Sequence, residues 1–169
     1  IDDRANGGGN VSPMILERLS REPYRLTMRR GSARIGTVPD AVQVGPKVCL
    51  INKYSASDGD LFPWGFRALG LGKLIGTRTW GGIVGISGSL PYMDGTDIRV
   101  PFFTSFDPKT GSWIIENHGV DPDILIDNDP VKEWNGEDQQ LDRAIQEVMK
   151  ELQNRKPLPG VPTPRDFSK

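Results

Sequence analysis

Residues 54–60 constrain the fold most, because an apolar run ends just before them and a helical pattern begins just after them. Residues 47–52 have the apolar and β-branched side chains of a buried strand. Residues 61–70 have the pattern of a helix that Gly70 would end. The chain is therefore expected to pass from a strand through a tight turn into a helix.

Ser57 lies at this turn, where free backbone N–H groups and the positive end of the helix dipole favour developing negative charge. A hydroxyl that attacks a carbonyl there could place the oxyanion against these amides, which makes Ser57 a candidate nucleophile. The alternative is a structural role, because Ser and Asp are the preferred N-cap residues and Ser57-Asp58 precedes a helix. The turn taken alone favours the cap.

The length and charge of the chain exclude several classes of protein. Its 169 residues suit one domain with a proper core, and its net charge of -1 gives no electrostatic basis for binding nucleic acid. No stretch is apolar enough to cross a membrane, so we expect no membrane partner. No residues have the spacing of metal ligands, so we expect no metal or organic cofactor. The single cysteine, Cys49, excludes an internal disulfide and is expected in the core.

The chain begins like the end of a strand that runs into the glycine loop Gly7-Gly8-Gly9. A helix is expected next, with Ser12 as its cap and Pro13 at its first position. Backbone amides of such a loop can bind an oxyanion, although the spacing fits neither a P-loop nor a dinucleotide fingerprint. A flexible turn that lets two backbones approach is the structural alternative. Because a strand cut in its middle is an unusual start, we expect the chain to be part of a longer polypeptide.

The middle of the chain contains several shorter patterns. Residues 24–46 predict an irregular connection with one short strand. Residues 73–79 predict a second buried strand, and the glycine-rich residues 80–86 an extended segment that another chain or a ligand approaches closely. Turns at residues 94–95 and 109–111 predict two hairpins.

The C-terminal part contains the clearest helical pattern. Apolar residues recur at helical spacing between residues 138 and 152, after a short predicted strand at residues 124–126. Residues 156–164 contain four prolines and are expected to be extended. We therefore divide the chain into a core domain, residues 1–155, and a proline-rich tail, residues 156–169.

Four motifs together resemble a known family. They are Asn6-Gly7-Gly8-Gly9, Ser57-Asp58-Gly59-Asp60, the string at residues 70–82, and Glu116-Asn117-x-Gly119-Val120-Asp121-Pro122-Asp123. In this order they are similar to the catalytic core of tricorn protease and its tricorn-like relatives, which belong with the carboxy-terminal processing serine peptidases. The resemblance reaches to about residue 152. It implies an α/β fold of the crotonase-like or Clp-protease-like kind, a sheet with packed helices, as a fragment of a larger multidomain peptidase.

The resemblance also implies roles for individual residues. Ser57 would be the nucleophile of a serine endopeptidase that cleaves oligopeptides through an acyl-enzyme. The backbone N–H groups of Asp58 and Gly9 would form the oxyanion hole. Glu116 would belong to the charge relay, orienting the base indirectly and stabilising its protonated form.

Substrate binding is expected at the strand that ends in Gly85-Ile86. By resemblance this strand runs beside the substrate backbone, and Ile86 helps line the pocket for the side chain before the cut. Members of the family prefer basic side chains there, owing partly to an acidic residue after the first helix, but residues 24–30 contain no acid. A trypsin-like preference is therefore not expected, and apolar and mixed preferences both stay open.

The general base is missing from the expected set. The family places a histidine, preceded by a serine, upstream of the glycine loop, so we expect an upstream region of the same parent protein to supply it and the fragment alone to be inactive. The only histidine, His118, is interpreted as a surface turn residue. A substitute base at His118 and a Ser-Lys pair with Lys53 or Lys73 are the alternatives.

The resemblance further implies self-association into a homo-oligomer, and we expect a cytoplasmic location, with periplasmic or exported locations left open. Two other functions compete with the peptidase. One is a non-catalytic module of the same fold that binds peptides or directs assembly. The other is an acyl-CoA enzyme that uses the glycine-loop amides for a thioester oxyanion and does not need Ser57.

Overall fold

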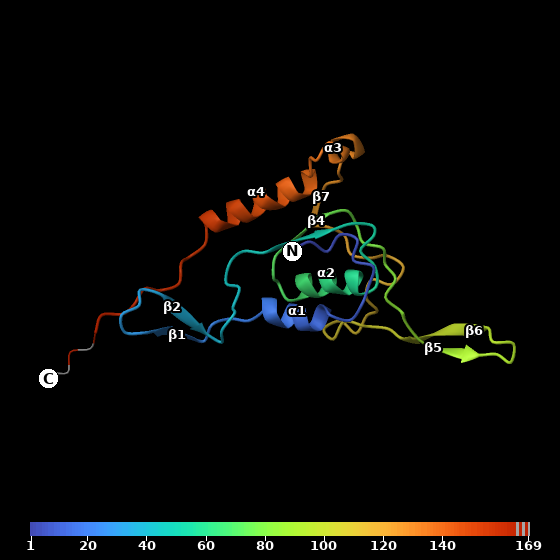
Figure 1. Cartoon of the computed structure of the whole chain (residues 1–169), viewed down its shortest axis with the longest axis horizontal. Helices are drawn as coiled ribbons and strands as arrows, with labels where there is room; N and C mark the ends of the chain where they lie inside the picture. Colours follow the sequence, from blue (N-terminus) through green and yellow to red (C-terminus); the bar gives the residue numbers. More distant parts are fainter. Residues whose placement is uncertain (165, 167, 169) are drawn as a thin grey trace.

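The computed structural model describes residues 1–164, 166 and 168, and for residues 87–90 it describes the backbone. Figure 1 shows a central body of helices and a small sheet, with one hairpin at each end of the long axis. In chain order the elements are α1 (Ser12–Leu19), β1 (Arg25–Met28), β2 (Ile35–Val38), β3 (Val48–Ile51), α2 (Asp58–Ala68), β4 (Lys73–Gly76), β5 (Gly85–Pro91), β6 (Asp97–Phe103), β7 (Ile124–Leu125), α3 (Pro130–Trp134) and α4 (Gln139–Gln153).

The sheet of the central body has three parallel strands in the order β3-β4-β7. The first residues of the chain extend it, because Asp2 forms a parallel bridge with Leu50 and the Ile1 nitrogen donates to the Val48 carbonyl (2.9 Å). The predictions of a strand end before the glycine loop and of two buried strands are therefore confirmed. β4 ends at Gly76, three residues earlier than predicted.

The core lies on both faces of this sheet, because alternate side chains of a strand point in opposite directions. Cys49 and Ile51 pack with Phe62 and Phe66 of α2 on one face. Val48 and Leu50 pack on the other face with apolar residues that include Ala144 of α4. Helices thus cover both faces, which confirms the α/β fold class. Burial raises the pKa of the Cys49 thiol well above its ordinary value, so this cysteine is an inert core residue.

Helix α1 forms as predicted, but its expected cap was wrong. Ser12 is the first helical residue, and the N-cap is Val11, whose side chain cannot cap. The backbone N–H groups of Val11 and Ser12 instead donate to Oδ2 of Asp58 in α2 (3.1 Å each). The cap therefore comes from another element.

The connection between α1 and β3 is more regular than predicted. β1 and β2 pair antiparallel, with Leu26 opposite Thr37, where only one short strand was expected. Both strands are four residues long and neither has a fully buried face, so they lack the alternation that reveals a strand. The prediction of an irregular segment was wrong for this reason.

The two predicted hairpins are confirmed. β5 and β6 turn at residues 94–95, where the Tyr92 N–H donates to the Thr96 carbonyl (2.8 Å). The second hairpin is reduced to one bridge between Phe106 and Trp113, whose rings meet edge to face at 6.0 Å. In Figure 1 the β5–β6 hairpin projects away from the central body.

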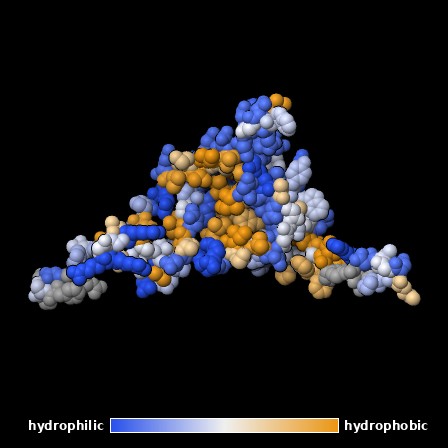
Figure 2. Space-filling view, viewed as in Figure 1, coloured by the Kyte–Doolittle hydropathy of each residue, from blue (hydrophilic) through white to orange (hydrophobic). Residues whose placement is uncertain are grey.

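Helix α4 was predicted almost to its ends, and Asp138 caps it by accepting the Leu141 N–H (2.9 Å). Apolar residues gather over the central body beneath α4 in Figure 2. Among the described helices, none is both long and apolar enough to cross a membrane.

Candidate active site

Ser57 has a strained backbone at the turn from β3 to α2. It occupies the N-cap position with φ 57° and ψ -112°, a conformation that residues with a side chain rarely adopt. Its side chain is exposed, whereas the next three residues are buried. Strain of this kind persists only where the surroundings impose it, and it often marks a functional site. A serine on a sharp turn between a strand and a helix is also the geometry that exposes a nucleophilic hydroxyl.

The glycine loop packs directly against this serine. A Cβ added at Gly8, which has φ +128°, would lie 3.0 Å from the Cβ and 3.3 Å from the Oγ of Ser57. The loop is fixed by Asn6, whose Oδ1 accepts the Gly8 N–H (3.1 Å) and whose carbonyl accepts the Ala56 N–H (2.8 Å). The loop therefore has a defined place beside Ser57, rather than serving as a free turn.

The two predicted oxyanion donors lie on neighbouring segments. Asp58 is the first residue of α2, where the helix leaves backbone N–H groups without partners. Within the described part of the chain, the N–H groups of Gly9 and Asp58 donate no hydrogen bond. A Cβ at Gly9 would lie 3.9 Å from Oδ2 of Asp58, so the loop runs alongside the start of α2.

The side chain of Asp58 has a role that the sequence did not reveal. Its carboxylate caps α1 just after the glycine loop, and its carbonyl accepts a hydrogen bond from Oγ of Ser12 (3.2 Å). Asp58, whose amide is a predicted oxyanion donor, thus also ties the end of the glycine loop to α2 through its side chain and carbonyl.

Two carboxylates hold the glycine-rich segment that follows β4. Asp60 accepts the N–H groups of Gly81 (2.8 Å) and Gly82 (3.1 Å). Glu116 accepts the N–H groups of Ile83 (2.7 Å) and Val84 (3.0 Å) through Oε2. Side chains of the same protein therefore approach this segment, the predicted approach of another chain or a ligand stays a prediction, and Glu116 lies against the residues that lead into β5.

The predicted substrate residues begin β5, so the prediction that a strand ends at Gly85-Ile86 was wrong. Gly85 pairs with Phe103 and Ile86 with Pro101, both on β6. The Ile86 side chain is 59% exposed. Within the described chain β5 pairs only with β6, which leaves its other edge free. A free edge can accept an extended peptide through main-chain hydrogen bonds.

An apolar cavity of about 610 Å³ lies between α1, α2 and residues 105–114. Its walls include Leu16, Asp58, Leu61, Phe106 and Ile114. Leu61 follows Ser57 by one helical turn, and its N–H donates to the Ser57 carbonyl (3.0 Å). The cavity can therefore hold an apolar side chain close to the start of α2.

The alternative bases have other partners. Nε2 of His118 lies 2.7 Å from Oδ2 of Asp121, and His118 lines a hollow beside the C-terminal half of α2, whereas Ser57 precedes its N-terminus. Lys73, the first residue of β4, pairs with Glu147, and Nζ of Lys53 lies over the Tyr54 ring. Among the described residues, no basic side chain is hydrogen-bonded to Ser57.

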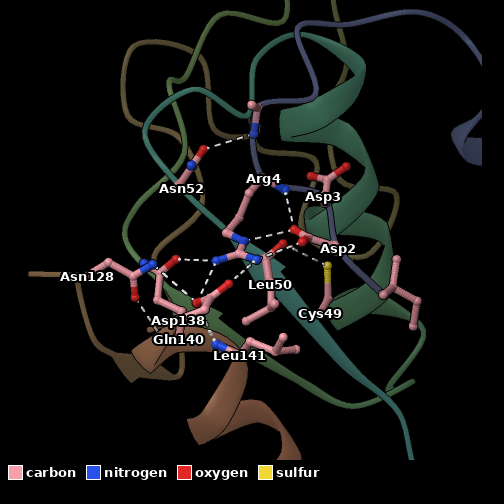
Figure 3. A network of polar contacts seen from close by, with 12 residues as sticks. Asp2, Asp3, Arg4, Cys49, Leu50, Asn52, Asn128, Asp138, Gln140 and Leu141 are labelled. Carbon is pink, nitrogen blue, oxygen red and sulfur yellow. Dashed lines mark hydrogen bonds and ion pairs between the residues drawn. The ribbon is translucent and has the colours of Figure 1, made fainter. Parts of the chain in front are cut away.

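A polar network anchors the start of the glycine loop to the C-terminal helix (Figure 3). Arg4 donates to Asp2 (2.9 Å), Asp138 (3.0 Å) and Gln140 (3.1 Å). The hydrogen bond from Arg4 is the main cause that lowers the pKa of Asp138 to about 2. The network fixes the residues from which the glycine loop extends.

Asp3, which precedes the glycine loop in the chain, is buried. Its Oδ1 accepts from Nδ2 of Asn6 (2.9 Å), while Oδ2 has no partner among the described residues. Burial, reinforced by the nearby charges of Asp58 and Asp60, raises the pKa of Asp3 to about 7. Among the described residues, no group of three His, Cys, Asp or Glu side chains could hold a metal ion.

Comparisons with known proteins agree with this geometry. The sequence profile of peptidase family S41 matches residues 1–126. The tricorn protease of Thermoplasma volcanium is 43% identical over 159 residues, which cover 92% of this chain and 15% of that protein. A crystal structure of tricorn protease superimposes with a TM-score of 0.82 at 41% identity, covering 90% of this chain and 15% of that one. The photosystem II D1 C-terminal processing protease superimposes with a TM-score of 0.53 at 25% identity, covering 75% of this chain and 33% of its own.

These matches cover most of this chain but only a small part of the tricorn proteases themselves. The family match includes all four motifs, from the glycine loop to the segment that begins at Glu116. The chain therefore belongs to peptidase family S41, among the tricorn-like members of that family.

Proposed function

We propose that this chain is the core of a serine endopeptidase that hydrolyses oligopeptides through an acyl-enzyme on Ser57. The observation that carries the proposal is the strained, exposed Ser57 with the glycine loop packed against it and two free amides beside it. A structural N-cap would need no such loop. Membership of family S41 supports the same reaction class.

In this mechanism Ser57 Oγ attacks the scissile carbonyl carbon and gives its proton to a base. The N–H groups of Gly9 and Asp58 stabilise the negative oxygen of the tetrahedral intermediate. The C–N bond then breaks, the leaving amine takes the proton, and water hydrolyses the ester. The base is a histidine of an upstream region of the parent protein, and Glu116 orients it as a member of the charge relay.

The substrate binds as an extended strand along the free edge of β5, beginning at Gly85 and Ile86. The apolar cavity near Leu61 suits an apolar side chain, which favours an apolar preference over a basic one. The names of the tricorn proteases among its relatives support peptides as substrates. We also propose that residues 1–155 act as one domain with residues 156–169 as a tail, that the parent protein forms a homo-oligomer, and that it is cytoplasmic.

The test is labelling with a fluorophosphonate probe, which reacts with activated serine hydroxyls. We expect the full-length parent protein to be labelled, the Ser57→Ala variant to be unlabelled, and these 169 residues alone to be unlabelled because they lack the base. A folded parent that takes no label would favour the non-catalytic module. Peptide hydrolysis or thioester turnover that survives Ser57→Ala would favour the acyl-CoA enzyme.

A further inference from the structure

Asp60 joins two segments that the proposed reaction must keep in register. Its side chain is fully buried (0% exposed) in the first turn of α2. Oδ2 accepts the N–H of Ser57 (2.9 Å) and of Gly82 (3.1 Å), and Oδ1 accepts the N–H of Gly81 (2.8 Å). A single carboxylate therefore bonds both the nucleophile and the segment that leads to the substrate-binding edge.

These hydrogen bonds act where the backbone is strained. The positive φ of Ser57 is unfavourable for a residue with a side chain and must be imposed by its neighbours. The Ser57 carbonyl is fixed by the N–H groups of Asp60 and Leu61, which any helix would supply. The Ser57 N–H, in contrast, is fixed by the Asp60 carboxylate alone among the described residues.

The same carboxylate fixes the start of the glycine-rich segment. Gly81 is held on both sides, because its N–H donates to Asp60 and its carbonyl accepts the Asn117 N–H (2.8 Å). Gly85 follows only three residues after Gly82, so a shift at the Asp60 contact would pass directly to the free edge of β5.

We infer that Asp60 is a positioning residue that sets the Ser57 hydroxyl and the substrate-binding edge in one fixed relation through its three backbone contacts. It touches no substrate and transfers no proton. This inference rests on the proposed function for its catalytic consequence, although the three contacts can be tested without activity.

The variant that tests it is Asp60→Asn in the full-length parent protein. An amide of the same shape has one acceptor oxygen, so in either orientation its NH₂ group faces at least one of the three backbone N–H groups. Because small displacements in an active site can cost about 100-fold in rate, we expect kcat and the labelling rate per folded molecule to fall together by roughly 10- to 100-fold. Labelling at the wild-type rate would overturn the inference.

Glu147→Gln is the matched control. Glu147 is also a buried carboxylate, but it bonds Lys73 and Arg143 on the side of the sheet that α4 covers. We expect Glu147→Gln to lower the melting temperature and leave the labelling rate of the folded protein unchanged. An equal loss of labelling in both variants would indicate a general effect of stability and would overturn the inference.

Amide hydrogen exchange separates a positioning role of Asp60 from a general loss of stability. In Asp60→Asn the amides of Ser57, Gly81 and Gly82 should lose protection, while those of Ile83 and Val84, held by Glu116, should keep it. If the variant does not fold, hydrogen exchange in the wild-type protein tests the inference instead, because the three amides held by Asp60 should exchange together. Independent exchange of the three amides would overturn the inference, even in a protein whose Ser57 takes no label.

Discussion

Gly8 leaves little room for a side chain beside Ser57, because a Cβ there would approach the Cβ of Ser57 to 3.0 Å and the φ of +128° is strained for any residue with a side chain. We expect Gly8→Ala to displace the glycine loop or Ser57 and to reduce fluorophosphonate labelling by about 100-fold. Gly7→Ala is the control, since a Cβ at Gly7 would meet nothing within 4 Å. Equal labelling of the two variants would mean that the loop does not position the nucleophile.

We expect a single oxygen of the Asp58 carboxylate, Oδ2, to contribute to the stability of the fold. Both N–H groups that it caps donate to Oδ2, so Asp58→Asn can keep them by turning its amide oxygen toward α1. Asp58→Ala removes the cap and should lower the free energy of unfolding by about 1 to 2 kcal/mol. Urea unfolding of both variants tests this difference. A cost as large for Asn as for Ala would contradict the cap.

Asp3 should make stability fall as the pH rises. Its pKa is raised from 3.8 to about 7 in the folded protein, so between these values the folded state holds a proton that the unfolded state has lost. The stabilisation is complete below pH 4 and is lost by about pH 7, and its size is at most about 4 kcal/mol.

Asp3→Asn should therefore reduce the pH dependence of the unfolding free energy between pH 4 and pH 7. Chemical unfolding at several pH values measures this slope. Asp40→Asn, at an exposed position, controls for the loss of one negative charge and should keep the wild-type slope. An unchanged slope in Asp3→Asn would show that Asp3 is not the group responsible.

Asp138 should act in the opposite direction at lower pH. Arg4 lowers its pKa from 3.8 to about 2, so its contribution is present above pH 4 and is lost as the pH falls toward 2. We expect Asp138→Asn to remove up to about 2 kcal/mol at neutral pH and much less at pH 2, where about half of the carboxylate is protonated. Thermal unfolding across this range measures the effect. A destabilisation that is equal at both pH values would show that the charge of Asp138 is not its cause, since Asn can keep the helix cap.

If the proposed peptidase function is correct, the apolar cavity predicts a preference for peptides with an apolar side chain before the cut. A charge placed at Leu61 would lie in its wall, so Leu61→Asp should lower kcat/KM for peptides with an apolar side chain before the cut by about 10-fold or more. The same variant should gain relative activity on basic side chains. Leu69→Asp, at the exposed C-cap of α2, is a useful comparison because Leu69 lines the far end of the cavity. Equal effects of the two substitutions would argue against a pocket near Ser57.

Local patterns made much of this protein predictable. The passage from β3 to α2, the turn at Asp94-Gly95 and the helix after Asp138 each depend on residues that are close in sequence. Only one of the two four-residue strands β1 and β2 was expected, because pairing, and not a buried face, stabilises them. Helix α3 was likewise not predicted, since it has no buried residue to produce a pattern.

The candidate site was predictable only through its motifs. Ser57, Gly9 and Glu116 stood out by resemblance, but the contacts that hold them join distant parts of the chain. The carboxylate that caps Ser12 is 46 residues away, and two of the three amides that Asp60 holds, those of Gly81 and Gly82, are 21 and 22 residues from it. A sequence gives the residue types in such contacts without showing which of them meet.

The parallel pairing of the central strands has a geometric consequence for the site. The glycine loop leaves the sheet after Asp2, the Ser57 turn after β3, and the Gly81 segment after β4, all at the same edge. The register of β3 and β4, in which Leu50 pairs with Ile75, therefore sets how far the Ser57 turn lies from the Gly81 segment. A slip of one residue between β3 and β4 would displace one part of the site from the other by about 3.3 Å. That distance exceeds the length of the hydrogen bonds at Asp60, so such a slip would break them. The alignment of the core strands therefore determines how accurately the residues at their ends are positioned.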